Sequence, residues 1–131
     1  MNGIKLRGLG RCVPAQSVTN DDLAKTVDTS DAWITARTGI RSRRRCTEET
    51  HTELCVTAAR RALAQAGITP ADIGACIVAT VSADTIVPSA ACMLQRDLGM
   101  PEDTPCFDLN AACTGFIYAL HTMECLLNAA P

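Results

Sequence analysis

The sequence from residue 107 to residue 116 is Phe107-Asp108-Leu109-Asn110-Ala111-Ala112-Cys113-Thr114-Gly115-Phe116. A short apolar strand here runs into small residues and a cysteine, and then into an amphipathic helix extending from about Cys113 toward Asn128. An earlier continuous apolar run at 75–81 is typical of a strand covered on both faces. The helix expected between the two strands starts at Ser89 and is closed by Gly99. This order predicts an α/β fold with a mainly parallel sheet covered by helices.

The residues before this unit predict one more strand and three more helices. The apolar segment from Ile4 to Val13 predicts a strand, in which Gly8 and Gly10 indicate a close approach of another backbone. Helices are predicted from Thr19 or Asn20 to Val27, from Ser30 to Arg37, and from Thr50 to the stop at Gly67. The chain alternates between strands and helices throughout, without an internal repeat.

Composition excludes several classes of protein. The chain has 131 residues, 47% of them hydrophobic and 20% charged, which fits one folded domain or part of one and not a disordered chain. A formal charge of −2 does not favour nucleic acid as a partner. The apolar runs are too short to span a bilayer and no apolar signal segment is evident, so we expect a cytoplasmic protein without a membrane partner. The eight cysteines form no C-x-x-C pair, so we expect free thiols and no metal site.

Cys113 is the candidate nucleophile. A cysteine at a helix N-terminus lies beside unpaired backbone N–H groups and the positive end of the helix dipole, which favour the thiolate. The small neighbours Ala111, Ala112 and Gly115 leave room for a sharp turn and for an acyl group on sulfur. The alternative is a buried free cysteine that only packs against small residues. Neither histidine completes a Cys–His pair in the sequence, because His121 lies two turns along the same helix and His51 begins another helix.

Trp33 and Arg37 form a second candidate site. They are four residues apart and therefore neighbours on one helix face, which places a flat aromatic surface beside a cation, as a nucleotide with phosphates requires. Seven of the twelve basic residues gather at Arg37, Arg41, Arg43, Arg44, Arg45, Arg60 and Arg61. The alternatives are a core tryptophan beside solvated arginines, or RNA binding, for which one tryptophan offers little stacking surface.

Three motifs together resemble a known family. They are Asp28-Thr29-Ser30-Asp31-Ala32-Trp33-Ile34 with Arg37-Thr38-Gly39-Ile40, then Val87-Pro88-Ser89-Ala90-Ala91-Cys92, and then Phe107-Asp108 with Ala111 to Phe116. In order and spacing they resemble beta-ketoacyl-acyl carrier protein synthase III, the condensing enzyme that initiates bacterial fatty acid synthesis. The resemblance covers nearly the whole chain. It implies a thiolase-like fold, of which residues 1–131 form the N-terminal half-domain, so that the fold is incomplete and the C-terminal half is absent.

The resemblance also implies a reaction and residues that perform it. Cys113 would take the acetyl group from acetyl-CoA, and malonyl-acyl carrier protein would then be decarboxylated and condensed with it, without a cofactor. Trp33 would stack on the adenine of CoA, Arg37 would meet a phosphate, and Thr29 would bond near the base. Val87 matches a position that lines the acyl pocket across the interface of a homodimer.

Departures from the family limit what we expect of this chain. The family's catalytic histidine and asparagine lie in the second half, so we expect the fragment alone to be inactive in condensation. Thr114 stands where a smaller residue is common, and Asn110 where an apolar one is common. The alternatives are a related condensing enzyme of secondary metabolism, or a catalytically silent half-fold acting as a binding module. A half-fold also exposes apolar surface, which predicts self-association.

Overall fold

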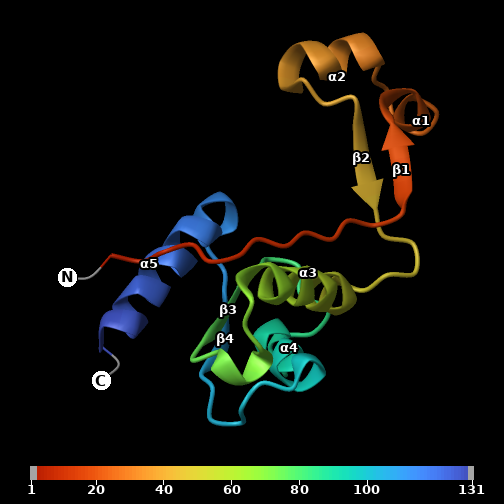
Figure 1. The fold of residues 1–131 in the computed structure, drawn as a ribbon. Helices are drawn as coiled ribbons and strands as arrows, with labels where there is room; N and C mark the ends of the chain where they lie inside the picture. The colour runs from red at the N-terminus through yellow and green to blue at the C-terminus, as the bar shows by residue number, and fades with distance from the viewer. Residues whose placement is uncertain (1–2, 130–131) are drawn as a thin grey trace. The chain divides into compact units, whose positions relative to one another are not determined.

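The computed structural model describes residues 3–129, which divide into two compact units (Figure 1). Of the described residues, the hairpin unit comprises Val13–Thr50, and the main unit comprises 3–12 and 51–129. Within the described residues, no helix is both long enough and apolar enough to cross a membrane. The eight cysteines, all of them within 3–129, are free thiols, as the sequence predicted.

The hairpin unit consists of two short strands and two short helices. Its elements are β1 (Gln16–Thr19), α1 (Asn20–Ala24), α2 (Asp31–Thr38) and β2 (Ser42–Arg45). The two strands are antiparallel, with Gln16 opposite Arg45 and Thr19 opposite Ser42. The strand character of the arginine run was not predicted, because four polar residues in a row carry no apolar alternation.

The capping predictions hold in this unit. Thr19 and Asp22 form a capping box at α1, although the helix ends at Ala24, before the predicted Val27. The Ser30 side chain accepts a hydrogen bond from the Trp33 amide at 3.1 Å, and Gly39 ends α2 with a left-handed φ of 70°. Both ends of α2 are therefore set by local sequence.

The main unit contains the predicted strand–helix–strand arrangement. Its elements are α3 (His51–Ala66), η1 (Pro70–Asp72), β3 (Cys76–Ala79), α4 (Ala90–Leu98), β4 (Cys106–Leu109), η2 (Ala112–Thr114) and α5 (Gly115–Ala129). The strands β3 and β4 are parallel, with Cys76 opposite Cys106 and Ala79 opposite Leu109, and α4 is the crossover between them. The α/β prediction is confirmed.

Two strand predictions are corrected. The segment from Ile4 to Val13 forms no strand, because its backbone contacts a helix instead of a sheet. The Leu9 amide donates to Gln65 Oε1 at 2.5 Å, and Arg61 donates to the Arg11 carbonyl at 2.6 Å. The predicted close approach does hold: a Cβ placed on Gly8 or Gly10 would collide with the backbone of α3. The other correction concerns β3, whose residues are not covered on both faces: within 3–129 it pairs with β4 alone, and of its residues only Val78 is buried.

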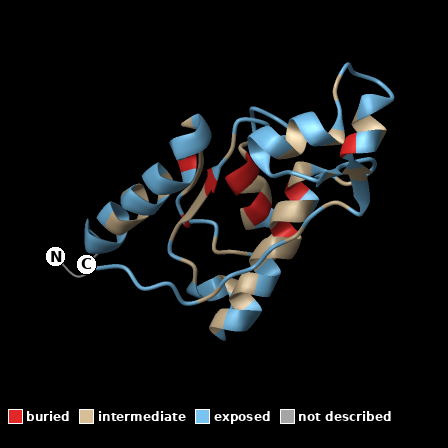
Figure 2. Cartoon of the chain, turned by 90° about the horizontal axis from the view of Figure 1, so that it is seen from above, coloured by how far each residue is buried: buried red, intermediate tan, exposed pale blue. Residues whose placement is uncertain are grey.

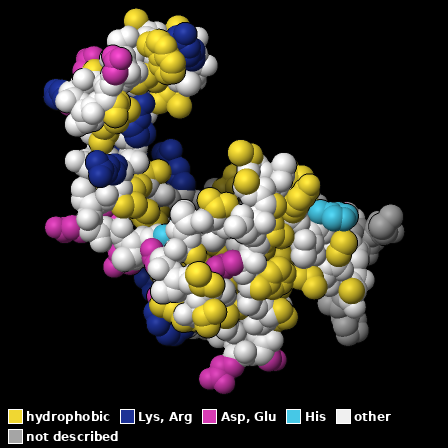
Figure 3. Space-filling view, turned by 180° about the vertical axis from the view of Figure 1, so that it is seen from behind, with side chains coloured by type: hydrophobic (Ala, Val, Ile, Leu, Met, Phe, Trp, Pro, Cys, Tyr) yellow, Lys and Arg dark blue, Asp and Glu magenta, His cyan; other side chains and the backbone are white. Residues whose placement is uncertain are grey.

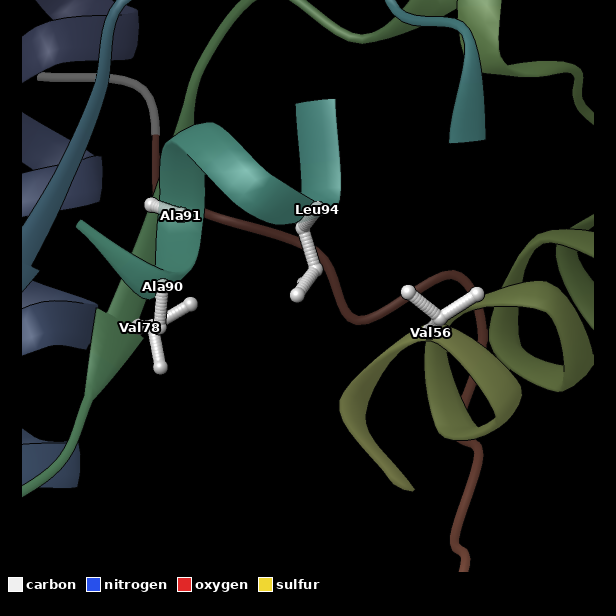
Figure 4. Close-up of a cluster of buried hydrophobic side chains, with 5 residues drawn as sticks. All are labelled: Val56, Val78, Ala90, Ala91 and Leu94. Atoms are coloured by element: carbon white, nitrogen blue, oxygen red, sulfur yellow. The ribbon is translucent and has the colours of Figure 1, made fainter. Parts of the chain in front are cut away.

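The core is small and centred on α4. Its buried apolar side chains are Val56, Val78, Ala90, Ala91 and Leu94 (Figure 4). Buried positions along the chain are red in Figure 2. Cys55, Cys76 and Cys106 pack against this cluster, as small core cysteines would, and burial raises the pKa of the Cys76 thiol to about 12. By contrast, Cys46, Cys113 and Cys125 are exposed.

Two aspartates from other parts of the main unit cap its helices. At the start of α3, Asp84 accepts hydrogen bonds from the His51 amide at 3.0 Å and from the Thr52 amide at 2.8 Å. At the start of α4, Asp108 in β4 accepts hydrogen bonds from the amides of Ala90 and Ala91 at 2.8 and 2.9 Å. Carboxylates at helix N-termini satisfy free N–H groups and the helix dipole. These contacts therefore tie α3 to the loop that follows β3, and α4 to β4.

Candidate active site

Cys113 lies in the connection from β4 to α5. The connection is the single turn η2, in which the Thr114 amide and hydroxyl donate to the Ala111 carbonyl at 3.1 and 2.8 Å. The predicted helix from Cys113 therefore begins two residues later, at Gly115, and Cys113 immediately precedes its first turn. The thiol is exposed, so the alternative of a buried packing cysteine is wrong.

The backbone turns sharply just before the thiol. Ala112 has a φ of 45°, and it is the only non-glycine residue within 3–129 with a positive φ. For an L-residue this conformation costs about 1–2 kcal/mol, and such outliers cluster at functional sites. The small residues around Cys113 therefore lie in a turn whose positive φ at Ala112 is unfavourable for alanine.

An apolar cavity of about 800 Å³ adjoins Cys113. We call it the Cys113 groove. Its lining residues come from six parts of the main unit, namely the N-terminal segment, α3, β3, α4, η2 and α5: Gly10, Cys55, Ala58, Ile77, Val78, Ala79, Leu94, Ala112, Cys113, Phe116, Ala119, Leu120 and Met123. A volume of this size falls within the range of small-molecule sites. Because the lining is mostly apolar and includes Cys113, the groove suits an acyl chain attached to the Cys113 sulfur.

Neither histidine contacts the candidate nucleophile. His51 lies 3.7 Å from the Cys55 sulfur through Nε2, and burial raises the pKa of the Cys55 thiol. His121 lies 3.9 Å from both Glu124 and Cys125 on the same helix. The prediction that these two histidines provide no base for Cys113 agrees with these contacts. Among residues 3–129, no group of three or more His, Cys, Asp or Glu side chains could hold a metal ion.

Trp33 and Arg37 form the predicted pair on α2. The Arg37 Cζ atom lies 4.2 Å from the centroid of the Trp33 ring, which is cation–π geometry. The tryptophan is 53% exposed, so the alternative of a core tryptophan is wrong. Thr29 is half-buried directly before the Ser30 cap. These three residues belong to the hairpin unit, whereas Cys113 and Val87 belong to the main unit.

Val87 lies in an exposed apolar loop between β3 and α4. It is 85% exposed and its neighbour Ile86 is 94% exposed. Apolar side chains also cover the outside of α5, where Phe116 and Ile117 are more than half exposed, and hydrophobic side chains are visible on the surface in Figure 3. An apolar surface of this kind is characteristic of a part that packs against something else.

Similar proteins are known that match most of the chain, although no family model matches it. Beta-ketoacyl-[acyl-carrier-protein] synthase III of Clostridium acetobutylicum is 49% identical over 122 residues, which cover 93% of this chain and 37% of that protein. The crystal structure of 3-oxoacyl-[acyl-carrier-protein] synthase III from Aquifex aeolicus matches with a TM-score of 0.93 and 42% identity, over 97% of this chain and 41% of that one. The chain is a relative of beta-ketoacyl-[acyl-carrier-protein] synthase III.

The similarity confirms the predicted fold. The fold is the N-terminal portion of the thiolase-like synthase III fold, and the chain spans about two fifths of the length of the curated relatives it matches. The priming beta-ketosynthase of the R1128 polyketide pathway also matches, with a TM-score of 0.84 and 37% identity, over 92% of this chain and 36% of that one. Condensing enzymes of primary and secondary metabolism therefore share this architecture with the chain.

Sequence reasoning missed the residues that hold the site in place. Asp108 was quoted for its motif but not as a cap of α4, and Asn20 was considered only as a possible start of α1. Their partners lie 11 to 23 residues away, so no local pattern identifies them. A polar residue inside an otherwise apolar stretch, as Asp108 is in Phe107-Asp108-Leu109, is the one available signal.

Proposed function

We propose that the chain carries the acyl-accepting site of a synthase III type acyltransferase, with Cys113 as the nucleophile. The observation that carries this proposal is the exposed thiol on the turn after Ala112, at the edge of an apolar groove of about 800 Å³. The sequence identity to synthase III enzymes supports it. A cysteine sulfur is the nucleophile that forms a thioester, and an apolar groove beside it can hold the acyl group.

The proposed reaction has two steps. The Cys113 thiolate attacks the carbonyl carbon of acetyl-CoA, the bond from that carbon to the CoA sulfur breaks, and CoA leaves as a thiolate that takes up a proton. Malonyl-acyl carrier protein then loses carbon dioxide, and its carbanion attacks the acetyl carbonyl, releasing the Cys113 thiolate and acetoacetyl-acyl carrier protein. Acetyl-CoA is a substrate and no cofactor is needed. The resemblance places the family's catalytic histidine and asparagine in the second half, and His51 and His121 contact residues other than Cys113, so we propose that this chain alone supports the first step and not the second.

The hairpin unit is proposed to bind CoA. One face of the Trp33 ring is occupied by Arg37, and the exposed ring leaves its other face for the adenine. Arg37 would meet a phosphate, and Thr29 would hydrogen-bond near the base. Arg41 and Arg45 are also exposed in this unit, so further cations are available for the phosphates.

A second candidate function differs from the first in the acyl group that is transferred and in the pathway that the enzyme serves. Similarity to the R1128 priming ketosynthase favours a condensing enzyme of secondary metabolism as the alternative. The proposed acyl-pocket residue Val87 is fully compatible with either, since it is small and exposed. Comparing acetyl-CoA with longer acyl-CoA thioesters in the same assay distinguishes the two. For either function we propose a cytoplasmic enzyme that acts as a homodimer with acyl carrier protein as its second substrate.

Intact mass spectrometry after incubation with acetyl-CoA tests the proposal. We expect an adduct of about 42 Da, one acetyl group, that peptide mapping assigns to Cys113. Cys113→Ala should abolish the adduct. Cys125→Ala, which removes another exposed thiol, is the matched control and should leave it unchanged. Acetylation spread over all exposed cysteines, or none on Cys113, would refute the assignment of the nucleophile.

A further inference from the structure

Asn20 is the most completely buried polar side chain among the described residues. It is 1% exposed in a unit where α2 has no buried residue at all. Its amide group donates to Asp31 Oδ1 at 2.7 Å and to the Ile40 carbonyl at 2.8 Å, and its oxygen accepts from Arg43 at 2.7 Å. The hairpin unit is therefore assembled around one hydrogen-bonded amide in place of an apolar core.

These bonds hold one side of α2. Asp31 and Thr35, one turn apart, both face Asn20, with the Thr35 hydroxyl at 3.4 Å from its amide nitrogen. Trp33 and Arg37 are each two positions further along the helix. At 100° per residue, they lie about 200° around the axis from Asp31 and Thr35, on the opposite side. The rotation of α2 about its axis thus determines where Trp33 and Arg37 point.

The charges around Asn20 reinforce this geometry. The amide hydrogen bond from Asn20 is the main reason that the pKa of Asp31 lies below its ordinary value, so this carboxylate is ionised and a strong acceptor. Arg43 approaches the other end of the Asn20 amide and also donates to the Val18 carbonyl at 3.3 Å. The Asn20 amide donates to the Asp31 carboxylate and accepts from the Arg43 guanidinium. A carboxylate side chain could only accept and a cationic side chain could only donate, so neither would satisfy both partners.

We propose that Asn20 is a positioning residue for the CoA site, which orients the Trp33–Arg37 face of α2 by holding its opposite face. This role rests on the proposed function of the hairpin unit. Asn20 itself faces the inside of the unit and does not touch the ligand. Its loss is expected to weaken CoA binding by misorienting α2, and not by removing a contact to CoA.

Trp33 reports on the site, since it is the only tryptophan in the chain. Titration of the full chain with CoA, followed by tryptophan fluorescence, gives the dissociation constant. Asn20→Asp keeps the shape and the bond from Arg43 but places a carboxylate against Asp31. We expect it to weaken CoA binding about tenfold. Asn20→Asp combined with Asp31→Asn restores a donor and an acceptor between these two positions but not the bond to the Ile40 carbonyl, so it should recover part of the affinity.

Thr19→Ala is the control that distinguishes positioning of α2 by Asn20 from a general loss of stability of the hairpin unit. This variant removes the capping box of α1 in the same unit, so it lowers stability without touching α2. It should bind CoA as the wild type does at a temperature where both are folded by circular dichroism. If Asn20→Asp does not fold, Thr35→Val takes its place. It removes a hydroxyl that donates to Asp31 at 3.2 Å and should weaken binding about threefold.

Each outcome has a definite meaning. Wild-type affinity in Asn20→Asp, or in Thr35→Val where that variant is used, overturns the positioning role while leaving the CoA site in place. The role is equally overturned if Thr19→Ala weakens binding as much as the Asn20 variant does. A wild-type chain whose fluorescence does not respond to CoA overturns the proposed CoA site itself, and with it this role.

Discussion

Single residues in the turn before Cys113 determine how the thiol is presented. Ala112 has a φ of 45°, whereas the preceding Ala111 has an ordinary φ of −139°. Glycine adopts positive φ without the steric cost that alanine has, but it loses more conformational freedom on folding. The two alanines are adjacent and chemically identical, but Ala111 is half-buried and Ala112 is exposed, so they differ in exposure as well as in backbone conformation. The same substitution at both positions tests the backbone at Ala112.

Ala112→Gly is therefore expected to preserve or increase stability, by up to about 1 kcal/mol. Ala111→Gly should decrease it by about 0.5–1 kcal/mol, because only the entropic cost remains. Urea unfolding of both variants measures the difference. Equal destabilisation by the two substitutions would show that the backbone at Ala112 is not strained.

Glu49 makes the hairpin unit sensitive to acid. Its carboxylate accepts hydrogen bonds from the amides of Ala15 at 2.9 Å and Thr47 at 3.1 Å, and these bonds lower its pKa from 4.5 to about 2. The folded carboxylate holds its proton less tightly than the unfolded one. The stabilisation is thus fully present above pH 4.5 and is lost as the pH falls toward about 2.

Glu49→Gln should flatten the dependence of stability on pH between about 4.5 and 2. Thermal melts at a series of pH values through this window measure the slope. Glu48→Gln, a neighbouring substitution of the same kind at an exposed position, is the control and should keep the wild-type slope. An unchanged slope in Glu49→Gln would show that other carboxylates control acid unfolding.

At the scale of elements, helix ends set by a local cap were predictable, whereas the end of α1, the start of α5 and the partner of the N-terminal segment were not. Ser30 and Gly39 bound α2 through contacts within a few residues, so their sequence pattern suffices. The segment from Ile4 to Val13 has the composition of a strand, but its partner is decided by residues about 50 positions away. The glycines predicted the close approach correctly, whereas the type of partner, a helix, leaves no mark in the local sequence.

Packing of the N-terminal segment on α3 is testable at Gly10. A methyl group there would meet the carbonyl of Ala58 and the amide nitrogen of Ala62, which are backbone atoms of a helix and cannot move aside. Gly10→Ala is expected to destabilise the chain by about 1–3 kcal/mol. Gly3→Ala, in the same segment with no atom within 4 Å of the added carbon, should have little effect. Urea unfolding measures both, and equal stabilities would contradict the close approach.

At the scale of the whole molecule, the sequence predicted the class and the candidate site but not the amount of core. Residue type and spacing identified Cys113, Trp33 and Arg37 as candidates, and the family resemblance implied their roles, which remain predictions. All three residues are exposed. The continuous apolar run at 75–81 also predicted a strand covered on both faces, which corresponds to β3. Only Val78 of this strand is buried, because burial depends on which elements surround a strand and not on its own residues.

The exposed apolar surface of the main unit leads to the last prediction. Phe116, Ile117 and Leu127 on α5 are 57–68% exposed, and Ile86 and Val87 are more exposed still. A monomer seldom leaves so many large apolar side chains in water. We expect the isolated chain to self-associate, with a sedimentation coefficient that rises with protein concentration. Ile117→Lys with Leu127→Lys should reduce the association, and His121→Lys, which adds a charge to the same helix without removing apolar surface, should not. A single monomer boundary at all concentrations, together with a cooperative melt, would show that the chain is stable by itself.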